Sequence, residues 1–292
     1  MKPYSNTILH FSNIPSIHHS NIPLFQKEMN NQNKSENNKQ KGSRTINLFL
    51  LALMFYTRIP VKRDIDYSPD NLNKATRFFP LIGLIVGGIG ALVFWGASFV
   101  LPTVVAVILS TAATIYTTGA FHEDGFADFC DGFGGGYTKE RIITIMKDSR
   151  IGTYGAAGLL LMLLTKIFTL VSIDTKQIPL VIIAAHGFSR VMPVLVIFTT
   201  RYVRDDETSK IKPIGKKGSV ADLLSAIIFG SVMLFFFPWF FAAAIVPALL
   251  IITFFFRKYI TKKIGGYTGD CLGALQQICE VGFYLGVLVF SQ

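Results

Sequence analysis

Long runs of apolar residues alternate with short polar segments along most of the chain. A transmembrane helix needs about 20 predominantly apolar residues, because the hydrocarbon core offers no hydrogen-bond partner to an exposed backbone. We therefore expect an all-α fold, a polytopic integral membrane helical bundle of about seven transmembrane helices. They are predicted over Phe78–Leu101, Thr103–Gly119, Gly152–Val171, Ile178–Thr199, Val220–Phe237, Phe240–Phe256 and Cys271–Phe290.

The beginning of the chain departs from this pattern. The apolar stretch Ile46–Tyr56 is too short to cross a bilayer comfortably, so it predicts a short N-terminal interfacial or re-entrant helix, and an eighth full span stays open. Residues 1–45 contain too little apolar surface to offset the entropy of ordering, and they lack the pattern of a signal peptide. We expect a disordered polar tail at 1–45, then a single helical membrane catalytic domain at 46–292.

Composition supports a membrane protein and explains the charge. The 292 residues are 51% hydrophobic and only 16% charged, outside the usual range of soluble domains. The net charge of +10 could indicate nucleic-acid binding, but Lys and Arg are concentrated in four long loops, at 58–77, 139–150, 201–217 and 257–263. The opposite turns carry little besides Lys176, so the positive-inside rule predicts that the long loops are cytoplasmic and that nucleic acid is not a partner.

The cysteines indicate neither a disulfide framework nor a zinc site. Cys130, Cys271 and Cys279 are odd in number and contain no CxxC pair. We expect reduced, packed side chains.

Four acidic residues crowd into "HEDGFADFCDG", residues His122 to Gly132. If the preceding helix continues or restarts through this stretch, Asp124, Asp128 and Asp131 share one helical face. Carboxylates so placed repel one another, which favours a bound cation, and oxygen ligands without a Cys or His cluster favour Mg²⁺ or Mn²⁺. The alternative is a solvated acidic loop. His122 and Glu123 flank the predicted site but point elsewhere on such a helix.

The next residues carry groups suited to phosphate. The run Gly132–Gly136 predicts either a backbone approach to an anion or a hinge. "MKDSRIGTYG" then brings Lys147, Asp148, Ser149 and Arg150 to the mouth of the following span. Arg and Lys suit phosphate oxygens, although positive-inside anchoring is the alternative.

Ionisable residues also occur inside predicted spans. Asp270, Gly273, Gln277 and Glu280 share a helical face. Glu280 lies within an apolar segment, which by default indicates function, with structural pairing to Lys166 or Arg190 as the alternative. In "HGFSR", His186 and Ser189 lack a third orienting group and are interpreted as packing residues, whereas Arg190 is a candidate anion ligand.

Five motifs in order resemble the cobalamin synthases, also called adenosylcobinamide-GDP ribazoletransferases. The resemblance covers Leu48 to about Gly286. Its motifs are "FYTRIPV", "FFPLIGLIVG", "TTGAFHEDGFADFCDGFGG", "IMKDSRIGTYG" and "YTGDCLGALQQ". The family pattern has an apolar residue where this chain has Glu123, so metal ligation is not carried over to that residue.

The resemblance implies the last assembly step of vitamin B12 in the bacterial inner membrane, with the active site on the cytoplasmic side. Adenosylcobinamide-GDP is joined to α-ribazole, or to its 5′-phosphate, and GMP is released with Mg²⁺ as cofactor. Whether the protein forms a homo-oligomer or associates with other cobalamin-assembly enzymes stays open.

Together with the residues, the resemblance suggests site roles. The expected metal ligands are Asp124 and Asp128, with Asp131 as a third ligand or the general base and Asp148 as the rival base. The expected substrate-binding residues are Lys147, Ser149 and Arg150 for diphosphate oxygens, Arg190 for a remote phosphate, and Asp270 and Glu280 for a second metal or sugar hydroxyls.

Two other functions are considered. A CDP-alcohol phosphotransferase also uses clustered aspartates, but its pattern places an Arg where this chain has Asp128, so the spacing does not match. A cation transporter usually places ionisable groups near the bilayer midplane. Here most acidic residues lie at the predicted cytoplasmic ends of the helices.

Overall fold

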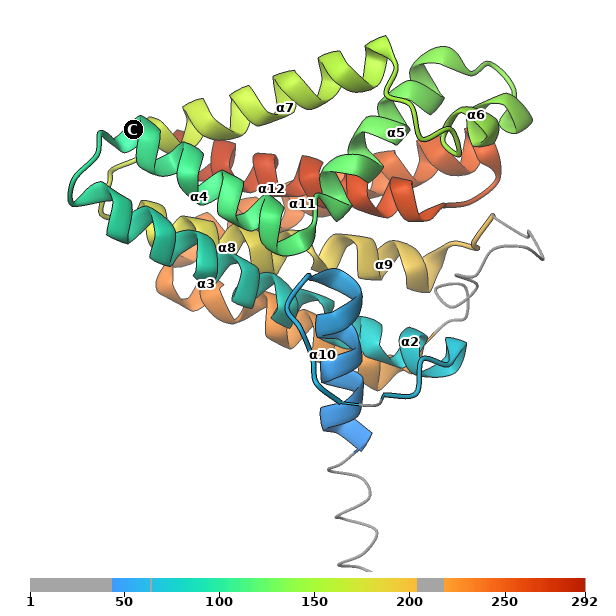
Figure 1. The fold of residues 1–292 in the computed structure, drawn as a ribbon, viewed down its shortest axis with the longest axis horizontal. Coiled ribbons are helices and arrows are strands. Elements are labelled where there is room, and N and C mark those ends of the chain that lie inside the picture. The colour runs from blue at the N-terminus through green and yellow to red at the C-terminus, as the bar shows by residue number, and fades with distance from the viewer. Residues whose placement is uncertain (1–43, 64, 204–217, 292) are drawn as a thin grey trace, which may run out of the picture. The chain divides into compact units, whose positions relative to one another are not determined.

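The computed structural model describes residues 44–63, 65–203 and 218–291. Every regular element in these ranges is a helix, and the only β feature described there is an isolated bridge between Tyr202 and Tyr267 (Figure 1). The predicted all-α class is confirmed. The predicted tail lies outside the described residues except for its last two positions.

The described helices occur in the following order along the chain. A helix over Arg44–Tyr56 is followed by α2 (Pro69–Ala75), η1 (Thr76–Phe78), α3 (Phe79–Ser98), α4 (Thr103–Thr118), α5 (Phe121–Gly135), α6 (Lys139–Ile145), α7 (Thr153–Val171), α8 (Ile178–Ser189), α9 (Val191–Thr199), α10 (Val220–Ser231), η3 (Val232–Phe236), α11 (Trp239–Ile264) and α12 (Gly269–Phe290).

The number of long apolar helices is smaller than predicted. Within the described ranges five are long and apolar enough to cross a membrane, or six if the bent pair α4–α5 is one span. The predicted span Val220–Phe237 is instead the 12-residue helix α10 followed by the 3₁₀ turn η3. The polytopic bundle is confirmed, as is the short N-terminal apolar helix, and among the described residues the predicted span Val220–Phe237 corresponds to the shorter apolar helical stretch Val220–Phe236.

The chain bends sharply just before the acidic stretch. Gly119 and Ala120 both have left-handed backbone angles, with φ of 68° and 59°, and the axes of α4 and α5 differ by 89°. Left-handed geometry costs a residue with a Cβ roughly 1–2 kcal/mol, so only Gly adopts it freely. The helix therefore restarts after Ala120, and the acidic stretch forms α5.

Small residues allow the central helices to approach closely. A Cβ at Gly83 of α3 would overlap the carbonyl oxygen of His186, and one at Gly87 would lie 2.9 Å from the Cα of Ile183 on α8. Such contacts are typical of membrane helix interfaces, where van der Waals packing replaces hydrophobic driving force. The span containing α8 and α9 is the most buried, at 83%, whereas α11 is only 22% buried and presents apolar side chains to lipid.

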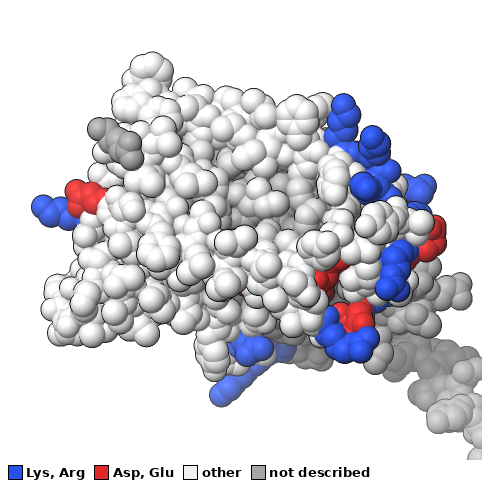
Figure 2. All heavy atoms as spheres, turned by 90° about the horizontal axis from the view of Figure 1, so that it is seen from above, with Lys and Arg blue, Asp and Glu red and all other residues white. Residues whose placement is uncertain are grey.

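Basic segments from distant parts of the chain meet at one end of the bundle. The N–H of Val203 donates to the carbonyl of Tyr267 (3.0 Å), and the N–H of Tyr267 donates to that of Arg201 (3.0 Å). The ring of Phe133 in α5 lies 5.4 Å from that of Tyr259 in α11, which joins the end of α11 to the same region. Lys and Arg side chains gather toward one end in Figure 2, as the loop pattern predicts for residues on one membrane side.

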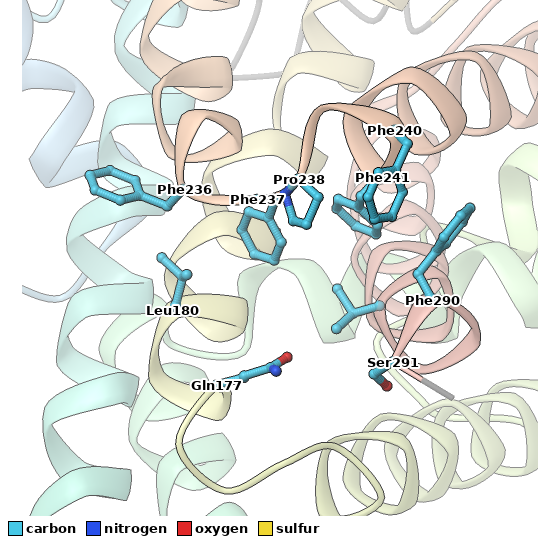
Figure 3. Close-up of a pocket in the computed structure, with 10 residues that line it drawn as sticks. Gln177, Leu180, Phe236, Phe237, Pro238, Phe240, Phe241, Phe290 and Ser291 are labelled. Atoms are coloured by element: carbon cyan, nitrogen blue, oxygen red, sulfur yellow. The ribbon is translucent and has the colours of Figure 1, made fainter.

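The other end contains an apolar cavity of about 300 Å³, shown in Figure 3. It lies between the beginning of α8, the turn from η3 to α11 and the end of α12. Its lining is Gln177, Leu180, Phe236, Phe237, Pro238, Phe240, Phe241, Val287, Phe290 and Ser291. At about 1.5 Å per helical residue, α12 separates Ser291 from Asp270 by roughly 30 Å. The cavity is therefore remote from the acidic stretch.

Candidate functional site

The acidic residues of α5 meet the beginning of α12 at a crossing built on two glycines. A Cβ at Gly125 would lie 3.1 Å from the Cα of Asp270, and one at Gly273 would lie 3.5 Å from the Cα of Gly125. The crossing therefore sets the backbone of Asp270 on α12 against α5 at the residue that follows Asp124. Asp128 follows Asp124 one helical turn later.

These three aspartates differ in exposure. Asp124 is exposed, whereas Asp128 and Asp270 are half-buried. Asp270 is in the first turn of α12, where the helix dipole favours negative charge, and it accepts a hydrogen bond from the Thr268 hydroxyl (3.3 Å). The side chains of these three residues offer carboxylate oxygens as metal ligands, which suit a hard cation.

A magnesium ion held at this crossing would need ligands in addition to the protein's carboxylates. Within the described ranges, no three His, Cys, Asp or Glu side chains are placed to hold a metal by themselves. Mg²⁺ usually takes one or two carboxylates plus phosphate oxygens and water. Asp124 and Asp128 can supply such a partial ligand set.

Replacing Gly125 with alanine should force α5 and α12 apart. The added methyl would meet backbone atoms of Asp270, which cannot rotate away, so we expect a loss of about 1–3 kcal/mol in stability. Gly88→Ala on α3 is the matched control because a Cβ there has no neighbour within 4 Å. Thermal unfolding in detergent measures both variants. Equal unfolding temperatures would contradict the close crossing.

Asp131, the third aspartate of the predicted cluster, has a different partner. Its carboxylate accepts the N–H of Gly152 (2.7 Å) and the N–H of Gly155 (2.8 Å), one on each oxygen. A Cβ at either glycine would overlap this carboxylate. Asp131 therefore fixes the beginning of α7, and the geometry does not support the predicted metal-ligand or general-base role. The shared helical face of α5 is open at Asp124 but covered by α7 at Asp131.

Asp131→Ala should destabilise the protein without removing a reacting group. Two N–H groups at the beginning of α7 would lose their acceptor, at a cost of about 1–2 kcal/mol each when left without a partner. Thermal unfolding checks the loss. Thr138→Ala removes the comparable cap of the short exposed helix α6 and should cost less. A smaller loss in Asp131→Ala than in Thr138→Ala would contradict this role.

The predicted rival base Asp148 is paired with Arg150. Arg150 Nη2 lies 2.7 Å from Asp148 Oδ2 in an exposed ion pair. The hydrogen bonds from Arg150 lower the pKa of Asp148 to about 2. While this exposed ion pair is formed, a carboxylate with so low a pKa is a weak proton acceptor near neutral pH, and the general-base role of Asp148 stays a prediction.

The segment that carries Lys147, Ser149 and Arg150 lies on the turn between α6 and α7, and all three residues are exposed. Asp131 ties the end of this turn to α5 through Gly152. Their predicted contact with phosphate stays a prediction, and the turn is held beside the helix that carries Asp124 and Asp128.

The glycine run serves packing. Gly132 to Gly135 form the last turn of α5, and the N–H of Gly136 donates to the carbonyl of Gly132 (2.9 Å). A Cβ at Gly132 would press on Met146, and one at Gly134 on the ring of Tyr154. The expected anion approach is not what the structure shows, because these amides belong to a helix.

Glu280 lies in a buried ion pair. It is fully buried, its Oε1 lies 2.8 Å from Lys166 Nζ, and its Oε2 accepts a hydrogen bond from Gln276 (2.6 Å). Tyr284 donates a further hydrogen bond to it (3.2 Å). This is the structural pairing considered as the alternative, and the geometry does not support substrate binding by Glu280.

Arg190 is also enclosed. Only 1% of it is exposed, its Nη1 donates to the carbonyl oxygen of His186 (2.6 Å), and its guanidinium lies 5.5 Å from the ring centre of Phe79. A substrate phosphate cannot reach it in this conformation, so the predicted remote phosphate site is not supported. Ser189 accepts a hydrogen bond from Gln276 (3.1 Å), in keeping with its predicted packing role.

Glu123 is a residue that the sequence reasoning set aside. It is 7% exposed, and its Oε1 accepts a hydrogen bond from Gln277 Nε2 (2.9 Å). Gln277 in turn accepts one from Lys166 Nζ (2.8 Å). The signal available in the sequence was the polar face of α12 containing Gln277, which needs polar partners on whichever helix it faces.

Comparison with known proteins matches this chain to one enzyme family. Residues 48–288 match the family described as cobalamin-5-phosphate synthase. An adenosylcobinamide-GDP ribazoletransferase of Shewanella frigidimarina is 45% identical over 252 residues, covering 85% of this chain and 96% of the relative. The enzyme of the same name from Vibrio parahaemolyticus is 43% identical over 248 residues, covering 84% and 93%. No solved structure matches the chain.

Proposed function

The chain belongs to the cobalamin-5-phosphate synthase family, and from this premise we propose that it transfers adenosylcobinamide phosphate to α-ribazole at the crossing of α5 and α12. The activity is that of an adenosylcobinamide-GDP ribazoletransferase, which performs the last step of cobalamin synthesis. The supporting observation is the glycine contact that sets the backbone of Asp270 against α5 at Gly125, the residue after Asp124.

The reaction exchanges one phosphoryl bond for another. A ribose hydroxyl of α-ribazole, or of its 5′-phosphate, attacks the phosphorus nearest the cobinamide. A new P–O bond forms, the diphosphate P–O bond breaks, and GMP leaves with the bridging oxygen while the proton of the hydroxyl passes to water. Such transfers pass through loose transition states, so positioning and charge stabilisation dominate over base strength.

Asp124 and Asp128 are proposed to hold Mg²⁺ together with phosphate oxygens of the substrate. When bound, the ion neutralises charge that develops on the departing GMP. Asp270 is proposed to orient the acceptor sugar, because it lies at the crossing and its carboxylate can accept hydrogen bonds from hydroxyl groups.

Lys147, Ser149 and Arg150 are proposed to bind the diphosphate from the turn that precedes α7. All three are exposed, and Asp131 holds this turn against α5. Binding of phosphate would require Arg150 to exchange its exposed contact with Asp148. Exposed ion pairs contribute about 0–1 kcal/mol, so this exchange is inexpensive.

The active site is proposed to face the cytoplasm. The basic segments gather at the end that carries α5 and α6, and the positive-inside rule assigns such segments to the cytoplasmic side.

Incubation of the purified protein with adenosylcobinamide-GDP and α-ribazole tests the proposal. We expect adenosylcobalamin and GMP, identified by mass, in the presence of Mg²⁺, and neither product when Mg²⁺ is removed by chelation. Parallel incubation with a CDP-alcohol tests the other enzyme class. Release of CMP there, without GMP release from the first substrate pair, would contradict the proposal.

A further inference from the structure

We propose that Glu123 is a positioning residue, which through its hydrogen bond to Gln277 fixes the rotation of α5 and thereby directs Asp124 and Asp128 toward the substrate. The proposal rests on the function proposed above. It assigns a role to a residue for which neither the motif resemblance nor the metal assignment offered one.

Neighbouring side chains on α5 point in directions that are fixed relative to one another. Successive residues of an α-helix are rotated by about 100°, so a residue held inward fixes where the next one points. Glu123 and Ala127 form the buried stripe of α5, at 7% and 6% exposure. Asp124 and Asp128 form the adjacent stripe, which is exposed and half-buried. Any rotation of α5 that releases Glu123 therefore also turns both aspartates.

Glu123 is held inward by a chain of buried polar contacts. Gln277 Nε2 donates to Glu123 Oε1 (2.9 Å), Lys166 Nζ donates to Gln277 Oε1 (2.8 Å), and Lys166 Nζ lies 2.8 Å from Glu280. We call these four residues the Glu123 strap. They link α12 to α5 and to α7, across 154 and 111 residues of sequence. A buried acid released from such a strap would leave polar groups without partners, which is strongly unfavourable in a membrane protein.

Movement of α5 toward α12 is restricted by the glycine crossing rather than by Glu123. At the crossing, the backbones of Gly125 and Asp270 are already in contact, so α5 cannot move closer to α12. Glycine contacts by themselves restrain rotation of α5 about its axis only weakly, because no side chains interdigitate between the two helices there. Asp131 holds the later part of α5 through its hydrogen bonds to Gly152 and Gly155, and the strap adds a restraint on rotation one residue before Asp124.

The experiment measures metal binding rather than turnover. Full-length protein in detergent is titrated with Mn²⁺ in the presence of adenosylcobinamide-GDP and without α-ribazole, and bound Mn²⁺ is followed by electron paramagnetic resonance against a protein-free reference. Loss of residues that orient metal ligands typically weakens metal binding about 10–100-fold. We expect Glu123→Ala to weaken Mn²⁺ binding about tenfold or more.

Two further variants separate the hydrogen bond from charge and packing. Glu123→Gln keeps an oxygen that can accept from Gln277, so its Mn²⁺ affinity should stay within about threefold of wild type. Gln277→Met removes the donor but keeps Glu123, and should weaken binding as Glu123→Ala does. Tyr284→Phe removes one hydrogen bond to Glu280 from a residue one turn further along α12 and keeps the contacts of Glu123, Gln277 and Lys166, so it should leave the affinity within about twofold.

The outcomes distinguish this proposal from the one on which it rests. Wild-type affinity in both Glu123→Ala and Gln277→Met, with reduced affinity in Asp124→Asn, overturns the positioning role and leaves the metal assignment standing. Equal damage in Glu123→Gln and Glu123→Ala also overturns it, because the charge rather than the hydrogen bond would then matter. If wild type binds Mn²⁺ no better than Asp124→Asn, the metal assignment fails and the positioning role fails with it. Should Glu123→Ala not fold, Gln277→Met decides the question.

Discussion

Asp124→Asn is expected to reduce Mg²⁺-dependent GMP release about a thousandfold, since a metal ion contributes several kcal/mol of transition-state stabilisation and each ~1.4 kcal/mol corresponds to a factor of ten. The substitution keeps the shape of the side chain and removes one ligand charge. Asp124 is exposed on α5, so the variant should insert into membranes as wild type does. Initial rates of GMP release at several Mg²⁺ concentrations measure the effect.

Glu140→Gln is the matched control for this loss. Glu140 is an exposed acid in the first turn of α6, near the same end of the bundle, and it takes no part in the proposed site. Its rate should stay within about twofold of wild type, as expected for an exposed substitution that changes local charge alone. Turnover of Asp124→Asn at a similar rate would show that Asp124 does not bind the metal.

Glu280→Gln is expected to lower the free energy of unfolding by about 3–5 kcal/mol. This is the usual cost of removing one charged partner from a buried ion pair. Lys166 would keep its hydrogen bond to Gln277 but would lose its counter-charge at 2.8 Å. Because neither residue is accessible to substrate, the loss should appear first in stability. Equilibrium unfolding in detergent measures it.

A double variant shows whether charge is the cause. Lys166→Met combined with Glu280→Gln removes both charges, so it should recover at least half of the stability that Glu280→Gln alone loses. A double variant less stable than Glu280→Gln would indicate that the hydrogen bonds, rather than the ion pair, stabilise this region.

The sequence predicted the bundle well because lipid imposes a single rule, that long apolar helices must satisfy their own backbones. Ile178–Thr199 is one span in both the prediction and the structure, although Arg190 divides it into α8 and α9. The stretch Val220–Phe237 was predicted with nearly the observed bounds, since the apolar helical segment runs over Val220–Phe236. The Ser219 capping box begins α10, and apolar composition could not show that the last turn, from Val232, is a 3₁₀ helix.

The candidate site was predictable only in part. Spacing alone placed Asp124 and Asp128 on one face of a helix, which the structure confirms for α5. Spacing could not show that α7 begins over Asp131, nor that the glycines at 125 and 273 bring Asp270 to α5. Both are contacts between segments far apart in sequence. The roles of Glu280 and Arg190 were open for the same reason, since a buried ionisable residue indicates function or pairing until its neighbours are known.

Anomalous diffraction from crystals of the full-length protein with Mn²⁺ and adenosylcobinamide-GDP tests the central claim most directly. We expect a manganese peak within coordination distance, about 2.0–2.3 Å, of carboxylate oxygens of Asp124 and Asp128, with the remaining positions filled by phosphate oxygens and water. A manganese ion bound to the nucleotide with no carboxylate of α5 in its coordination sphere would contradict the account.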